Sequence, residues 1–365
     1  MMGKKKIAVV VDNQGWCWST TANNIAHMIT KFDFDFFTNQ DFIMELSTGN
    51  TFKKYAMVWF RGYSSAAMNE KTLEKLDCKF ISTVGTGGKK LKIRLDGAER
   101  TAKEGLGLIV QNQMAVHEAY KRGYGKVWMI PNGVDNRLFF PSDKKPGDVI
   151  GVAANTTGSR SELKGVSFTK EACNMLNYEY KEVNAELPLS HESIAEWYRT
   201  LDYYLQPSHS EGCSNSVMEA MASGLPVFIC KDVGYHGEIC RSAIDYHDGQ
   251  VIFVKRDAKD IADKIRLLEG NPYIKQRCIK NGLQFAQEHD WKNIAQDYKD
   301  LFEEVLGLKR KPKREVQMGF TVGKTFYVEC EKGVRTKEKN YVAGHKYMLR
   351  EVQYTPIKGN FKVIG

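Results

Sequence analysis

The chain has 365 residues, of which 42% are hydrophobic, and a net charge of +9. This composition is typical of a globular protein with room for two ordinary domains. The longest apolar run near the N-terminus, residues 7–11, is too short for a membrane span or a signal peptide, so we expect a cytoplasmic protein. The eight cysteines form no C-x-x-C pair and no zinc spacing, which indicates reduced thiols rather than a zinc finger.

Residues 1–142 alternate strand and helix patterns. We expect strands at 7–11, 33–37, 55–60, 80–84, 108–111 and 127–130. Helical patterns lie between them at 20–30, 71–76 and 114–122. This order predicts a Rossmann-like, doubly wound open sheet, whose ligands bind at the carboxyl ends of its strands.

Residues 143–308 repeat the alternation after a polar linker at 143–148. We expect strands at 149–153, 178–183, 203–206, 227–230 and 251–254. The intervening helices are expected at 168–176, 193–200, 217–222 and 260–268, followed by two closing helices at 274–286 and 293–306. The sequence therefore predicts a second Rossmann-like domain.

The segment from Ser208 to Val227 carries the strongest signal for chemistry. It holds two carboxylates, Glu211 and Glu219, with seven residues between them, and small residues that lead into a helix. Unpaired N–H groups at such a helix N-terminus attract phosphate. The same residues also permit a second interpretation, since Ser216 and Glu219 fit the S-x-x-E capping box, which needs no ligand.

Four motifs together resemble a known family. They are P-N-G-V-D at 131–135, Arg160 with Lys164-Gly165, the Glu211–Glu219 segment, and L-P-V at 225–227. This set resembles the retaining glycosyltransferases of the GT-B fold, specifically glycosyltransferase family 4 (group 1), from about residue 5 to 307. The resemblance implies two Rossmann-like doubly wound domains that face a cleft. It also implies transfer of a hexose or pentose from a nucleotide sugar to a hydroxyl, with no metal and no cofactor beyond that co-substrate.

The resemblance assigns roles to individual residues. Glu211 would contact sugar hydroxyls beside the reacting carbon, and Glu219 would hold the nucleotide ribose. Arg160 and Lys164 would bind the diphosphate, so that Glu211, Arg160 and Lys164 form the catalytic set. Fixed cations and a helix N-terminus stabilise the charge that grows on the leaving diphosphate. The remaining donor-binding residues of the loop are Gly212, Ser214, Asn215 and Ser216.

The first domain departs from the family pattern where an acceptor would enter. The family histidine after a strand is replaced by Gly85, and the glycine-rich first loop is reduced to Gly15. A basic run at 89–94 lies where an acceptor would enter, and an ordinary solvated basic face is the alternative interpretation of that run. The string Asp33-Phe34-Asp35 alternates like a half-buried strand, so we expect no metal site there. The acceptor-side candidates are Gly15, Arg61, Gly85, Lys89, Lys90 and Lys92.

Residues 309–365 carry the whole net charge. They hold 14 Lys and Arg against 5 Asp and Glu, whereas residues 1–308 hold 39 of each. A basic linker at 309–314 precedes short strand patterns and glycine turns, which predict a small β-module. This tail indicates an anionic partner.

Three functions fit this organisation. The first is transfer of a sugar to a hydroxymethylated base in phage DNA, which the basic tail would bind. The second is transfer to a cell-surface or lipid-linked glycan, with peripheral contact between the tail and anionic lipid. The third is a non-catalytic module that binds a nucleotide sugar. A tail that only solubilises or oligomerises the chain is compatible with any of them.

Overall fold

The computed structural model forms two compact units, Met1–Lys309 and Arg310–Gly365, and each is described by itself. The described residues are 4–12, 17–49, 52–62, 70–85, 90–143, 147–153, 159–183, 190–209, 211–230, 249, 251–308, 325–330, 334–335, 340–341, 346–350 and 361–363. Among the helices in these ranges, none has the length and apolarity that a membrane crossing requires.

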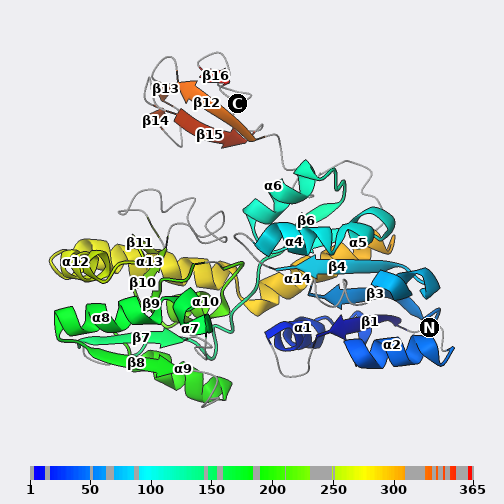
Figure 1. Cartoon of the computed structure of the whole chain (residues 1–365), viewed down its shortest axis with the longest axis horizontal. Coiled ribbons are helices and arrows are strands. Elements are labelled where there is room, and N and C mark those ends of the chain that lie inside the picture. The colour runs from blue at the N-terminus through cyan, green and yellow to red at the C-terminus, as the bar shows by residue number, and fades with distance from the viewer. Residues whose placement is uncertain are drawn as a thin grey trace. The chain divides into compact units, whose positions relative to one another are not determined.

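The first half of the large unit is a six-stranded parallel sheet in the order β2-β1-β3-β4-β5-β6 (Figure 1). Its strands are β1 (Lys5–Val11), β2 (Phe32–Thr38), β3 (Tyr55–Arg61), β4 (Phe80–Val84), β5 (Leu108–Val110) and β6 (Val127–Met129). The helical elements are α1 (Cys17–Met28), α2 (Asn39–Ser47), the 3-10 helix η1 (Glu70–Lys75), α4 (Lys90–Asp96), α5 (Glu99–Glu104) and α6 (Gln113–Lys121). The continuous apolar runs of β1 and β3 are buried, as expected for central strands covered on both faces.

The second half is a five-stranded parallel sheet in the order β11-β10-β9-β7-β8. Its strands are β7 (Val149–Ala153), β8 (Glu179–Val183), β9 (Tyr203–Gln206), β10 (Val227–Cys230) and β11 (Ile252–Val254). The helices are α7 (Ser159–Lys164), α8 (Val166–Leu176), α9 (His191–Arg199), α10 (Asn215–Ala222), α12 (Ala258–Glu269) and α13 (Pro272–Glu288). The prediction of an α/β fold with two doubly wound parallel sheets is confirmed.

Helix α14 (Trp291–Val305) differs from the prediction in where it packs. We expected residues 143–308 to form one domain, but the apolar stripe of α14 joins the core of the first sheet. The rings of Tyr298 and Phe302 lie 5.1 and 5.3 Å from that of Trp59 in β3. The period of the stripe predicts a buried face, but it does not identify the sheet that buries it.

The chain crosses between the two halves at two neighbouring points, near Val134 and near Trp291, and backbone hydrogen bonds link them. The backbone N–H of Val134 donates to the carbonyl of His289 at 2.9 Å, and that of Trp291 donates to the carbonyl of Val134 at 3.1 Å. Between these bonds, a Cβ on Gly133 would lie 2.7 Å from the ring of Trp291. Only glycine leaves room for this approach, which gives the P-N-G-V-D motif a structural reason.

The small unit contains short antiparallel strands, in line with the β-rich pattern of the tail. A three-stranded sheet has the order β15-β12-β16, and β13 pairs with β14. The strands are β12 (Thr325–Cys330), β13 (Val334–Arg335), β14 (Asn340–Tyr341), β15 (Lys346–Arg350) and β16 (Phe361–Val363).

Substitution of Phe302 tests the packing of α14. Phe302 is fully buried, so Phe302→Ala should cost about 3–5 kcal/mol of unfolding free energy in urea denaturation. Amide exchange should accelerate first in β1 and β3, because α14 completes their core. Gln296→Ala, at an exposed position of the same helix, is the control and should change little. Faster exchange in β9 and β10 instead would contradict this packing.

Candidate functional site

The loop between β9 and α10 begins where a buried strand ends at the carboxyl edge of the second sheet. Helix α10 starts after Ser214, whose side chain makes no capping hydrogen bond. Its hydroxyl instead lies 2.9 Å from that of Ser216 and 3.1 Å from the Gln206 side chain. The Ser214 side chain therefore does not cap the first turn of α10, and a helix N-terminus of this kind can bind anions.

The capping-box interpretation of Ser216 and Glu219 is wrong. The N-cap is Ser214, two residues earlier, and Glu219 lies inside the helix. Glu219 accepts a hydrogen bond from the hydroxyl of Tyr198 in α9 at 3.2 Å. Burial raises the pKa of Glu219 from 4.5 to about 7, and the Tyr198 hydrogen bond opposes this shift.

Glu211 forms an ion pair with Lys164, which brings together two of the three residues predicted to be catalytic. The Glu211 side chain is 15% exposed and that of Lys164 is 27% exposed. Gln206 Nε2 also donates to Glu211 Oε1, at 2.9 Å. Both contacts use Oε1, and Oε2 accepts no hydrogen bond from the part of the chain that the structure describes.

Helix α7 is held against the end of β9, which places Lys164 beside Glu211. Gly165 follows Lys164 with φ +70°, and a Cβ there would lie 2.5 Å from the Pro207 carbonyl oxygen. Arg256 donates to the carbonyls of Leu163 and Pro207 at 2.9 and 2.8 Å. Arg256 carries no sequence signal, because no motif distinguishes a cation that binds main-chain carbonyls from a solvated one.

Asn132 links the loop between β9 and α10 to the first half of the large unit. Its Nδ2 donates to the Cys213 carbonyl at 3.0 Å and to Asn215 Oδ1 at 2.8 Å. Asn112 Nδ2, after β5, donates to the Gly212 carbonyl at 3.3 Å. Two predicted donor-loop residues, Gly212 and Asn215, therefore lie against the carboxyl edge of the first sheet.

Arg61, predicted to lie where an acceptor enters, is placed by the structure in the interior of the large unit. It is fully buried, and its guanidinium donates to Asn132 Oδ1 at 3.3 Å, Thr21 Oγ1 at 3.0 Å and the Tyr298 hydroxyl at 3.2 Å. Its position at the end of β3 suggested solvent access, but the indole of Trp18 covers it, with the guanidinium carbon 4.8 Å from the ring centroid.

The other acceptor-side candidates do not form one cluster within the described residues. Gly85 leaves space that is filled by Gln111 and Trp18, since a Cβ there would lie 1.8 and 2.3 Å from their side-chain atoms. Lys92 is exposed on α4. Gly15 and Lys89 lie outside the described residues, as do the side chains of Arg160 and Lys90.

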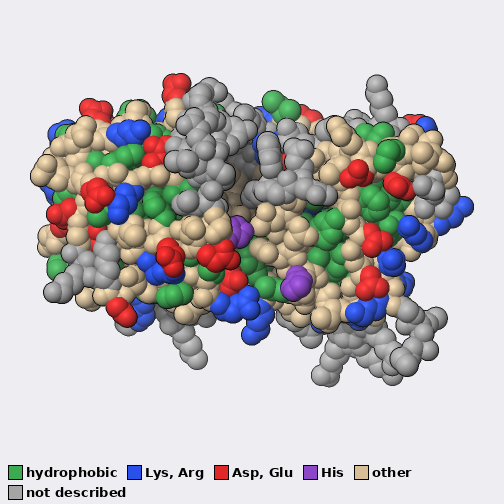
Figure 2. Space-filling model, turned by 90° about the horizontal axis from the view of Figure 1, so that it is seen from below, with side chains coloured by type: hydrophobic (Ala, Val, Ile, Leu, Met, Phe, Trp, Pro, Cys, Tyr) green, Lys and Arg blue, Asp and Glu red, His purple; other side chains and the backbone are tan. Residues whose placement is uncertain are grey.

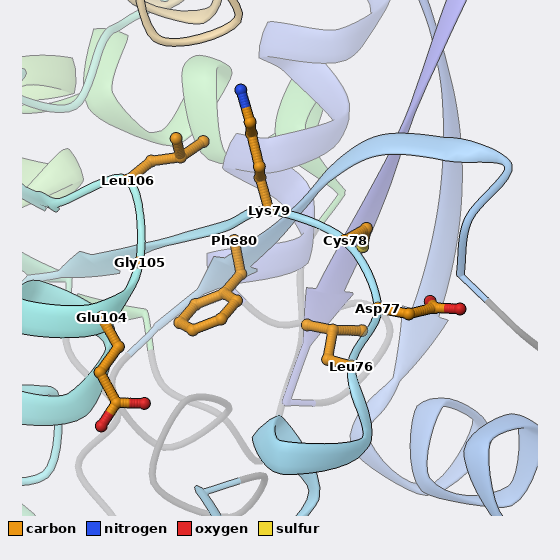
Figure 3. A pocket seen from close by; sticks show the side chains of 8 residues that line it. All are labelled: Leu76, Asp77, Cys78, Lys79, Phe80, Glu104, Gly105 and Leu106. Atoms are coloured by element: carbon orange, nitrogen blue, oxygen red, sulfur yellow. The ribbon is translucent and has the colours of Figure 1, made fainter.

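Two other features of the described ranges bear on a metal site and on a pocket beside β4. No group of three or more His, Cys, Asp or Glu residues there is arranged to hold a metal ion. A pocket of about 410 Å³ lies at the amino end of β4, away from the carboxyl edge. Its charged side chains, Asp77, Lys79 and Glu104, point in different directions (Figure 3).

Comparison with known sequences gives partial matches. Residues 151–285 match the family model "Glycosyl transferases group 1". A stretch of 115 residues is 33% identical to the N,N'-diacetylbacillosaminyl-diphospho-undecaprenol alpha-1,3-N-acetylgalactosaminyltransferase of Campylobacter jejuni, covering 31% of this chain and 29% of that protein. A stretch of 118 residues is 32% identical to a lipopolysaccharide core biosynthesis mannosyltransferase of Rhizobium meliloti, covering 30% and 32%. The chain thus spans about a third of the length of the curated relatives it matches.

Comparison with solved structures extends over most of the chain. Sucrose-phosphate synthase of Thermosynechococcus elongatus superposes with a TM-score of 0.68 at 14% identity, over 84% of this chain and 100% of that one. Anabaena HepE, in complex with UDP and glucose, superposes with a TM-score of 0.64 at 14% identity, over 82% and 100%. The fold is therefore the predicted GT-B fold.

The raised pKa of Glu219 predicts a pH-dependent cost. The folded protein holds this proton more tightly than the unfolded chain, so ionisation removes stability as pH rises from about 4.5 to about 7. Glu219→Gln stays neutral, so at pH 8 it should unfold at a higher Tm than wild type. The gain in unfolding free energy should be at most about 3 kcal/mol. The advantage should shrink at pH 5, and exposed Glu196→Gln on α9 should show no such trend. An equal difference at both pH values would contradict this account.

Proposed function

We propose that this chain is a glycosyltransferase that moves a sugar from a nucleotide sugar to a hydroxyl group. One observation carries the proposal: the Lys164–Glu211 pair lies beside the N-terminus of α10, whose N-cap residue Ser214 makes no capping bond with its side chain. A cation and the N–H groups at a helix N-terminus suit a diphosphate, and a carboxylate whose Oε2 accepts no hydrogen bond from the described residues suits sugar hydroxyls. The match of residues 151–285 and the likeness to a UDP-glucose complex of HepE support it.

The geometry leads to a mechanism for the donor. The diphosphate would bind Lys164 and the first turn of α10, where Glu211 Oε2 would accept hydrogen bonds from the sugar. Glu219 would accept from the ribose hydroxyls. As the bond between the anomeric carbon and the distal phosphate oxygen breaks, negative charge grows on the nucleoside diphosphate, where Lys164 and the helix dipole stabilise it.

The acceptor completes the reaction that we propose. Its oxygen bonds to the anomeric carbon on the face from which the diphosphate leaves, and its proton passes to the released phosphate. The configuration at that carbon is therefore retained, and charge stabilisation by Lys164 and α10 requires no metal. A non-catalytic binding module is the weaker alternative, because such a module has no need for Glu211 beside Lys164.

A cell-surface or lipid-linked glycan is the acceptor that we favour. Two relatives in sequence are named for an undecaprenol-linked glycan and for the lipopolysaccharide core. A hydroxymethylated base in phage DNA is the second candidate, because the tail at 309–365 is strongly basic. On the face of the large unit that Figure 2 shows, Lys and Arg side chains of the described residues lie among Asp and Glu side chains.

Substitution of the ion pair separates donor binding from transfer. Lys164→Ala should weaken UDP or GDP binding about 10- to 100-fold in calorimetry, because a charge-assisted contact to the diphosphate is lost. Glu211→Gln should keep that binding, since Lys164 is then released from its partner, but should abolish transfer in a mass-spectrometric screen of nucleotide sugars. Lys170→Ala, on the exposed surface of α8, is the control. Full transfer by Glu211→Gln would remove Glu211 from the mechanism.

Neutralising the basic linker tests the acceptor. The triple change Lys311→Gln, Lys313→Gln and Arg314→Gln should weaken binding to phosphatidylglycerol vesicles if the acceptor is lipid-linked. If the acceptor is DNA, binding to hydroxymethylated duplex should weaken instead, and its salt slope should fall by about one per cation. Lys121→Gln, an exposed residue of α6, is the matched control. Unchanged binding to both surfaces would exclude the linker from acceptor recognition.

A further inference from the structure

Gln206 lies at the centre of the candidate site, although no motif includes it. It is the last residue of β9 and is fully buried. Its Nε2 donates to Glu211 Oε1 at 2.9 Å, and its Oε1 accepts from the hydroxyls of Ser216 at 2.7 Å and Tyr204 at 3.0 Å. The Ser214 hydroxyl lies 3.1 Å from both ends of the amide.

The chemistry of these partners fixes the orientation of the amide. An ionised carboxylate only accepts hydrogen bonds, so the NH₂ end must face Glu211. The carbonyl end then faces hydroxyl groups, which donate to it. Burial raises the pKa of Tyr204, which keeps its hydroxyl protonated as a donor. A flipped amide would turn its oxygen toward Glu211 and its NH₂ toward the hydroxyls. It would lose the hydrogen bond to Glu211 and those that Ser216 and Tyr204 donate.

Because Lys164 and Gln206 both contact Oε1 of Glu211, its other oxygen, Oε2, is the one left to bind a ligand. Lys164 and Gln206 both contact Oε1, from two directions. A lysine on a flexible stem fixes distance but not rotation, because its three N–H groups turn freely. The Gln206 amide is instead locked by Ser216 and Tyr204 on a buried strand. It is therefore the contact that sets the rotation of the carboxylate and leaves Oε2 without a hydrogen bond from the described residues.

We propose that Gln206 is a positioning residue for sugar transfer, acting through Glu211. This inference rests on the proposed function, in which Glu211 Oε2 binds the sugar. A carboxylate with an uncontrolled rotation would still attract Lys164, but it would meet the sugar hydroxyls in the productive geometry only part of the time. A residue that merely completed the core would have no such link to Glu211.

Two variants test the proposal on the full chain. Gln206→Leu removes the donor at similar volume and should lower kcat about 10- to 100-fold, while the KM for the donor changes little. Gln206→Glu keeps the shape but sets two carboxylates side by side, and one of them takes up a proton as pH falls. That protonated group donates to Glu211 as the amide did, so activity relative to wild type should recover at low pH. The deficit of Gln206→Leu should stay constant with pH.

Tyr203→Phe is the matched control for loss of a buried hydrogen bond. Tyr203 is buried in the same strand, and its hydroxyl lies 3.1 Å from Glu269, outside the candidate site. This variant should keep kcat and show a flat ratio to wild type across pH. Thermal melting of all three variants reports whether they fold.

A second measurement does not depend on activity. The side-chain amide signals of Gln206 in ¹⁵N NMR are those absent from Gln206→Leu, and Glu211→Ala should shift them because it removes their acceptor. Wild type that transfers no sugar from any nucleotide sugar would defeat the proposed function, and unshifted amide signals would overturn the Gln206–Glu211 contact. An active wild type with a normal kcat in Gln206→Leu, or no acid recovery in Gln206→Glu, would overturn the positioning role alone.

Discussion

The hydrogen bonds of Asn132 are the interaction on which the arrangement of the large unit depends. Its Oδ1 accepts from Arg61 and Gln111, and its Nδ2 donates to Cys213 and Asn215. These groups lie among apolar side chains, where an unpaired polar atom costs about 1–3 kcal/mol. One amide therefore links the core of the first sheet to the loop that carries Glu211.

The buried charge of Arg61 explains why this link is specific. Among the described residues no carboxylate pairs with it, so its guanidinium is stabilised by oxygen atoms and by three aromatic rings, those of Trp18, Trp59 and Tyr298. These rings come from α1, β3 and α14, which must all be in place before the cation leaves water. Desolvation of an ion that lacks them is prohibitive. The first half thus completes its fold only with α14 returned to it.

The sequence predicted the features that recur with a fixed spacing. The alternation of strands and helices gave the two sheets, and the spacing of Glu211 and Glu219 identified the loop before α10. It did not predict the roles of Gln206 and Arg61, because a polar residue at a strand end has the same pattern whether it faces solvent or a buried partner. It also misplaced the start of α10: the pattern pointed to Ser216 as the cap, whereas the N-cap residue is Ser214 and both hydroxyls bond to Gln206 instead.

The double crossing at Val134 and Trp291 bears on how such a chain is cut or rearranged. A single break between the two halves of the large unit leaves the first half incomplete, because residues 1–142 alone lack the helix that covers Trp59. A recombination that replaces the second half of the large unit must therefore join it at Val134 and at Trp291. It must also keep α14 with the first half. Both the first strand and the last helix of the large unit therefore belong to its first half. In structural terms the second half is an insertion within the first, although the two halves follow one another in the sequence.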